Sequence, residues 1–137
     1  MKKYKQAIIP SVKIKTHTNL CQYVKNEYTS LIQGKSVINK HIGLTIYFGS
    51  DGKAELAYGR AIYAKKAALV QCLLELMREA EYTSFGQRKV KDDKNIFGYA
   101  KFKAKVYIDG KLENVHIVVV VKSNGKAYYC HEVNIKK

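Results

Sequence analysis

The run from Tyr99 to Ile108 limits the possible fold more than any other part of the chain, because apolar and polar residues alternate along it. Successive side chains of a β-strand point to opposite faces of its sheet, so this period of two predicts a strand that is buried on one face only. The predicted buried face carries Ala100, Phe102, Ala104, Val106 and Ile108. The predicted outer face carries Lys101, Lys103, Lys105 and Tyr107, which makes it cationic.

Two turn dipeptides divide the rest of the C-terminal segment into further strands. Asp109-Gly110 and Asn124-Gly125 are both typical of tight β-hairpin turns. Between them, residues 115–121 are β-branched except for His116, and residues 127–135 after the second turn also have the composition of a strand. Residues 99–137 therefore predict three antiparallel strands with one apolar face and one basic face.

Two helices are predicted before this sheet. Thr18 can cap a helix in which Leu20, Val24 and Tyr28 recur at helical spacing, and Gly34 ends it. Residues 61–80 predict a longer helix with an apolar stripe that packs across the sheet. The stripe consists of Ile62, Leu69, Leu73, Leu76 and Ala80, widened by Val70 and Met77.

Shorter elements are predicted between and before the helices. Residues 43–48 predict a strand that ends in a turn at residues 50–52, and residues 7–9 predict a short strand. Residues 82–85 could form the first strand of the C-terminal sheet. Residues 87–95 are charged and almost without apolar side chains, so they predict a loop.

Together these elements predict an α+β fold in which a helix packs on a four-stranded antiparallel meander sheet. No linker divides the chain, so residues 1–137 are expected to form a single domain. Within it, residues 1–40 would be a basic N-terminal extension with one helix. Residues 41–137 would form the core of helix and sheet.

The charge of the chain indicates a polyanionic partner. Lysine and arginine number 25 against 11 acidic residues, which gives a formal net charge of +14. Such an excess favours nucleic acid or an anionic membrane surface as the partner. Only Arg60, Arg78 and Arg88 are arginines, so the surface suits sequence-independent attraction of phosphates better than base reading. A lysine-rich soluble protein with no such partner is the alternative.

Several classes of function lack their sequence signatures. The cysteines Cys21, Cys72 and Cys130 stand far apart, which argues against a disulfide framework or a zinc site and favours a reducing compartment. There is no Walker loop, no GxGxxG motif and no HExxH motif, so no cofactor and no metal ion are expected. No apolar run approaches the roughly 20 residues of a membrane span, and the start of the chain does not have the pattern of a signal peptide.

Short motifs spread over residues 34–135 carry a family resemblance. They are residues 34–38, 43–46, 64–76, 80–82, 105–110, 118–122, 124–129 and 131–133. Together they resemble the large polyvalent protein-associated domains of phage and mobile-element proteins. The order of one helix and then about four strands also resembles the barnase, EndoU, colicin and RelE assemblage of small ribonucleases (the BECR fold). These resemblances imply a nuclease or toxin that acts in the bacterial cytoplasm, including one delivered into a target cell, and a cognate immunity or antitoxin protein.

Metal-independent RNA cleavage needs a base, an acid and a cation beside the reacting phosphate. His131, in the last strand, is the leading candidate for proton transfer, and Tyr129 shares its predicted face. His116 and Lys122 share one face of the preceding strand and could flank a phosphate. The alternatives are that His131 is a hydrogen-bonded core histidine and that His116 only marks the end of its strand.

The predicted binding residues are Lys101, Lys103, Lys105, Tyr107 and Arg88, the last as a phosphate clamp from the polar loop. The alternative for each of these charges is a solvated surface. The sequence leaves open which face of the last strand points outward. If the lysine face is the active face, the candidates on that strand become Glu132 and Tyr128 in place of His131.

The function that these features predict is a toxin-like, metal-independent endoribonuclease that cleaves RNA, with tRNA among its possible substrates. The alternative is a non-catalytic module of a phage or mobile element that binds nucleic acid or a protein partner.

Overall fold

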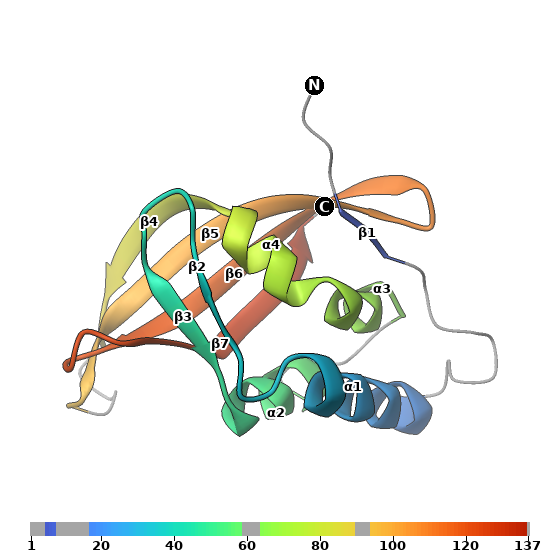
Figure 1. Cartoon of the computed structure of the whole chain (residues 1–137), viewed down its shortest axis with the longest axis horizontal. Helices are drawn as coiled ribbons and strands as arrows, with labels where there is room; N and C mark the ends of the chain where they lie inside the picture. Colours follow the sequence, from blue (N-terminus) through green and yellow to red (C-terminus); the bar gives the residue numbers. More distant parts are fainter. Residues whose placement is uncertain (1–4, 8–16, 59–63, 90–93, 137) are drawn as a thin grey trace.

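The computed structural model describes residues 5–7, 17–58, 64–89 and 94–136. The helices are α1 (His17–Leu31), α2 (Ser50–Tyr58), α3 (Ala64–Ala68), the 3-10 helix η2 (Leu69–Gln71) and α4 (Leu73–Glu79). The strands are β1 (Lys5–Ala7), β2 (Ser36–Ile38), β3 (Thr45–Phe48), β4 (Glu81–Gln87), β5 (Ile96–Ile108), β6 (Lys111–Lys122) and β7 (Ala127–Lys136). All of these strands belong to one curved sheet, and the helices lie on its concave side (Figure 1).

The sheet is mixed, with strand order β1-β5-β6-β7-β3-β2 and with β4 also paired to β5. The pairs β4–β5, β5–β6, β6–β7 and β2–β3 are antiparallel. The pairs β1–β5 and β3–β7 are parallel. The α+β class is therefore confirmed, and β4, β5, β6 and β7 pair in antiparallel order. The sheet is not the predicted four-stranded meander, however, because β1, β2 and β3 from the N-terminal half extend it on both sides.

The period of two in β5 is confirmed by the burial of its side chains. Phe102, Val106 and Ile108 are buried, whereas Lys101 and the other two lysines of the run are exposed. The turn after β5 is also as predicted, since Asp109 and Gly110 both have positive φ, at 50° and 81°. Positive φ at both central residues is the geometry of a type I′ hairpin turn, which matches the twist of the two strands.

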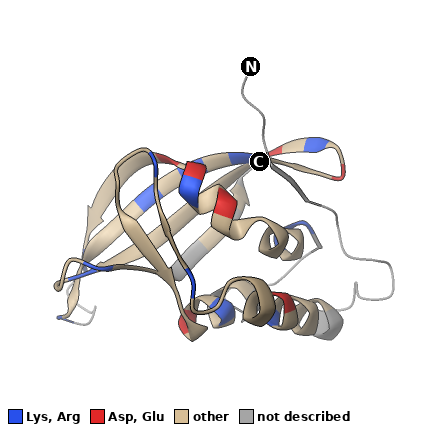
Figure 2. Cartoon of the chain, viewed as in Figure 1, with Lys and Arg blue, Asp and Glu red and all other residues tan. Residues whose placement is uncertain are grey.

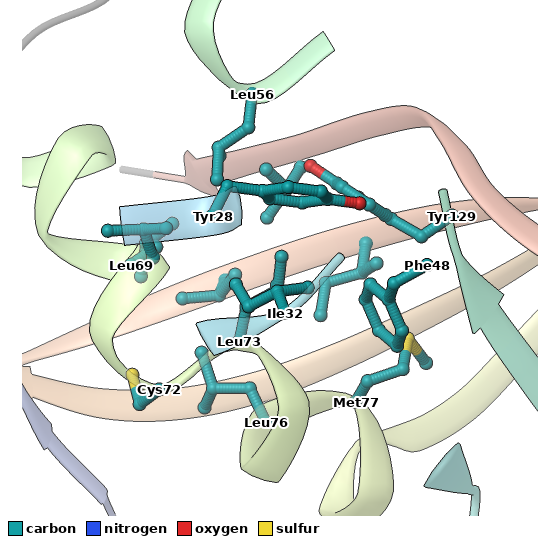
Figure 3. Packing of buried hydrophobic residues seen from close by; sticks show 14 of the residues in the cluster. Tyr28, Ile32, Phe48, Leu56, Leu69, Cys72, Leu73, Leu76, Met77 and Tyr129 are labelled. Carbon is teal, nitrogen blue, oxygen red and sulfur yellow. The ribbon is translucent and has the colours of Figure 1, made fainter. Parts of the chain in front are cut away.

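The concave face of the sheet and the helices form one hydrophobic core. Helix α1 inserts Val24, Tyr28 and other residues of its apolar face into this core, so it is an integral part of the fold and not an extension from it. In Figure 3 the ring of Tyr28 lies between Leu56 of α2 and the core residues below, and Phe48 of β3 lies near Met77 of α4. Because α4 contacts both β2 and β5, which lie far apart in the strand order, the sheet must curl around this helix (Figure 1).

The single helix predicted over residues 61–80 is divided in the structure into α3, η2 and α4. The break lies at Cys72, whose φ and ψ of −138° and 17° are not helical, and whose N–H donates to Leu69 three residues earlier. Short 3-10 segments commonly tighten such junctions. The predicted apolar stripe is nevertheless buried: Leu69, Val70, Leu73, Leu76, Met77 and Ala80 all lie in the core. Its other member, Ile62, lies outside the described residues.

Other local predictions differ from the structure in the bounds or in the type of the element. Residues 50–52 form the first turn of α2 and not a turn between strands, because Ser and Asp are favoured at helix starts as well as in turns. Strand β4 is longer than predicted and β1 covers residues 5–7 where the sequence indicated 7–9. A strand was predicted at residues 43–48, and β3 forms the last four of these residues. The predicted end of the first helix before Gly34 is confirmed.

A buried asparagine joins α4 to the segment between β2 and β3. The side-chain amide of Asn39 donates hydrogen bonds to the carbonyl oxygens of Met77 and Ala80, both at 2.8 Å. Its Oδ1 accepts hydrogen bonds from the backbone N–H groups of His41 and Ile42 at 3.0 and 3.1 Å. These contacts satisfy carbonyls at the end of α4, which have no partner within the helix.

Candidate nucleic-acid interface

The convex face of the sheet carries a group of exposed polar and cationic side chains, which we call the lysine face: Lys101, Lys103 and Lys105 of β5 with Asn114 and His116 of β6. The register places Lys103 opposite His116 and Lys105 opposite Asn114. Side chains directly opposite each other across two strands point to the same face, with Cβ atoms about 4.5–5.5 Å apart. Figure 2 shows the lysine bands that follow one another along β5.

One acidic side chain from β4 lies beside this face. Glu81 pairs with Lys103 in the β4–β5 register, and its carboxylate lies 3.9 Å from the lysine Nζ. Both side chains are more than half exposed, so this ion pair contributes at most about 1 kcal/mol. An ammonium group held so weakly can exchange this carboxylate for a phosphate.

The structure separates three of the four predicted catalytic residues. His116 is exposed on the lysine face, whereas Lys122 lies six positions further along β6, roughly 20 Å away at 3.3 Å per residue. Tyr129 is only 1% exposed, and its ring packs on Phe48 with centroids 5.6 Å apart. Tyr129 therefore takes part in the core. His131 belongs to β7, but its side chain lies outside the described part of the structure.

A bulge in β7 surrounds the position of His131. Val118 pairs with Glu132 and Val120 pairs with Tyr128, so residues 129–131 of β7 lie opposite Val119 alone. Strict alternation of faces does not continue through a bulge. The face of His131 therefore cannot be derived from its spacing to Tyr129.

Aromatic side chains extend the convex face beyond the lysines. Tyr107 is half-buried on β5, and Tyr47 of β3 lies beside Tyr128 of β7 with ring centroids 5.7 Å apart. The Nζ of Lys126 lies 5.8 Å from the centre of the Tyr47 ring, a cation–π distance. The pair of Tyr47 and Lys126 was not predicted, because parallel pairing of β3 with β7 brings them together from distant parts of the sequence.

A second basic group lies where β4 ends and β5 begins. Arg88, Lys89 and Lys94 line a pocket of about 920 Å³ together with Phe85 and Phe97. Arg88 was predicted as a phosphate clamp, but the two phenylalanines were not singled out. Their sequence signal is the repeated Phe-Gly dipeptide at residues 85–86 and 97–98, each beside a run of charged residues.

Other titratable side chains have structural contacts. The Nδ1 of His41 accepts a hydrogen bond from the backbone N–H of Tyr82 at 2.8 Å, which holds the start of β4. Lys65 of α3 forms an ion pair with Glu113, a buried carboxylate on β6. Among the described residues, no three His, Cys, Asp or Glu side chains are grouped as metal ligands would be.

The fold and the convex face define an α+β domain with a basic sheet surface. The chain matches the model of large polyvalent protein-associated domain 3 over residues 15–129, and it therefore belongs to this family. This confirms the resemblance to polyvalent-protein domains. No curated protein and no solved structure matches the chain, so the resemblance to the BECR nucleases is not confirmed.

Within the described ranges, none of the helices combines the length and the apolar composition that crossing a membrane requires.

Proposed function

We propose that this domain binds RNA through the lysine face. The observation that carries the proposal is that Lys101, Lys103 and Lys105 are all exposed on one face of a single rigid strand, with His116 beside them. A strand at the centre of a sheet holds its side chains in fixed relative positions. The phosphates of a nucleic acid can then contact several cations at once, and no flexible loop of the protein has to become ordered on binding.

The type of charge favours contact with the backbone of the nucleic acid. Lysine is a compact point charge that lacks the planar fork with which arginine recognises guanine, so these contacts would not select a sequence. Binding of this kind draws its free energy from counterions that are released from the nucleic acid. The net charge of +14 attracts a polyanion over the whole surface, and the lysine face supplies the local contacts.

Replacing Lys101, Lys103 and Lys105 together with glutamine is expected to weaken RNA binding by at least about tenfold at low salt. The measurement is the equilibrium affinity for a fluorescent single-stranded RNA, determined by anisotropy. The matched control replaces Lys35, Lys40 and Lys53, which removes the same charge from residues outside β5. If the two triple variants lose the same affinity, only net charge matters and the lysine face is not the binding surface.

A metal-independent ribonuclease activity is the second candidate, and the position of His116 favours it. Histidine exchanges protons near neutral pH, and here it stands opposite Lys103, a cation suited to a phosphate in the transition state. A single exposed histidine supplies one of the two proton-transfer groups, so the second would come from β7, where His131 lies. Such an enzyme would act on RNA in a bacterial cytoplasm, and a cognate immunity or antitoxin protein would restrain it.

His116→Ala is expected to reduce RNA cleavage by about 10²–10⁴-fold, because that is the typical contribution of a general acid or base. The assay is digestion of total RNA in the presence of EDTA, read on a gel, with RNA affinity measured in parallel. His131→Ala serves as the comparison. Unchanged cleavage by His116→Ala with loss of cleavage in His131→Ala would place the active site on β7. If the wild-type protein binds RNA without cleaving it, the domain is a binding module and not a ribonuclease.

A further inference from the structure

The pocket at the junction of β4 and β5 combines aromatic and cationic side chains in a way that the lysine face does not. Its volume is about 920 Å³. Two phenylalanines lie in its wall, and Arg88, Lys89 and Lys94 are exposed around it. The pocket lies at the end of the sheet where residues 85–89 and 94–97 meet the first residue of the turn between β6 and β7, Ser123.

The two phenylalanines are unusually exposed for their type. The exposed fraction of Phe97 is 64% and that of Phe85 is 39%. Their ring centroids lie 5.6 Å apart, with an angle of 44° between the ring planes. Phenylalanine is normally buried, and a pair that is left accessible beside cations indicates a surface that contacts a ligand.

The local backbone holds these rings in place. The ring of Phe85 lies over Gly98, where an added Cβ would stand 2.3 Å from a ring atom, so only glycine leaves space for it. The register of β5 shifts between Ile96 and Gly98, which places Phe97 in a bulge. The N–H of Ser123 donates to the carbonyl oxygen of Asn95 at 2.7 Å and ties the neighbouring turn to this segment. These contacts fix the two phenylalanine rings at the ends of β4 and β5.

We infer that this pocket takes unpaired nucleotides of a single-stranded nucleic acid, an inference that rests on the RNA binding proposed above. A base would stack on Phe97, with Phe85 as the second ring, and the flanking phosphates would contact Arg88 and Lys94. Bases of an intact duplex are already stacked on their neighbours and cannot present a free face. The pocket would thus give the domain a preference for single strands, while the lysine face attracts any nucleic acid.

Charge complementarity favours a nucleic acid over an apolar protein segment as the occupant. Among the described residues that line the pocket, three are cationic and none is an aspartate or a glutamate. Aromatic rings with nearby cations are the recurrent platform for single strands, since every base has a face that can stack.

Phe97→Ala is expected to weaken binding to an oligoadenylate by about 5- to 150-fold, the range that loss of one stacked base produces. Binding to a duplex RNA of equal length should stay within twofold. Phe97→Tyr should retain the affinity, because it keeps the ring. Ile38→Ala is the matched control, since Ile38 is similarly exposed, at 61%, on the distant strand β2.

Each other outcome overturns the inference. Equal affinity of Phe97→Ala and wild type for the oligoadenylate would show that the ring does not stack, and loss on both RNAs would show a general effect without strand selection. Binding of a glutamate-rich peptide that Phe97→Ala alone abolishes would identify a protein partner instead. The proposed RNA binding fails separately, when wild type binds neither RNA or when the glutamine triple variant of the lysine face loses nothing.

Discussion

Leu73→Asp is expected to prevent folding of the domain. Leu73, in the first turn of α4, is fully buried within the core between the helices and the sheet. An aspartate there would bury a carboxylate without a cation, or take up a proton at a cost of several kcal/mol. Because small domains are stable by only about 5–15 kcal/mol in total, this single change consumes most of the free energy of unfolding.

Circular dichroism and thermal unfolding measure this effect, with Leu112→Asp as the matched control. Leu112 lies at an exposed position of β6, so the same chemical change there should cost less than about 1 kcal/mol. A Leu73→Asp variant that melts like wild type would mean that α4 does not pack on the sheet through this side chain.

Asn39→Asp is expected to lower the free energy of unfolding by about 2–5 kcal/mol. The substitution keeps Oδ1, which accepts the N–H groups of His41 and Ile42, but it replaces the amide donor with an oxygen. That oxygen would face the carbonyls of Met77 and Ala80, leave both unsatisfied and repel them. The end of α4 would then detach from the segment between β2 and β3.

Urea denaturation measures this loss, with Asn26→Asp as the control. Asn26 lies at an exposed position of α1, where its amide oxygen accepts a hydrogen bond from Gln22. If the two variants have the same denaturation midpoint, the four hydrogen bonds of Asn39 do not join α4 to the sheet.

Local patterns in the sequence predicted the elements that depend on local physics. The alternation along β5 showed which of its side chains are buried, because one face of this strand contacts the apolar core and the other contacts water. The Asp109-Gly110 turn was equally clear, since few residues accept positive φ. The apolar spacing of α1 and of the stripe around Leu73 also predicted the correct buried faces.

The pairing of distant strands was not accessible in the same way. Strand β3 joins β7 in parallel, and the helices from α2 to α4 and the strands β4–β6 lie between them in sequence, so no turn motif marks the pairing. Three-residue strands such as β1 are too short to show a periodicity. The result was a predicted meander where the structure has a mixed sheet. The break at Cys72 was missed because the apolar stripe continues through it in sequence.

The candidate binding residues also differ in whether a local pattern or the meeting of distant segments determines their position. Lys101, Lys103 and Lys105 lie on one strand, so their common exposure followed directly from their spacing. The pocket around Phe97 forms where two strand ends, a bulge and a turn meet, and no single segment carries its pattern. The bulge in β7 similarly removed the basis for placing His131 from spacing alone.

The salt dependence of RNA affinity tests the proposed binding surface most directly. The logarithm of the affinity constant should fall linearly with the logarithm of the salt concentration, with a slope of about −0.7 for each phosphate contact to a single strand. Replacing Lys101, Lys103 and Lys105 with glutamine should make this slope shallower by about 2. The control variant at Lys35, Lys40 and Lys53 should keep the wild-type slope. An unchanged slope in the first variant would contradict RNA binding through the lysine face.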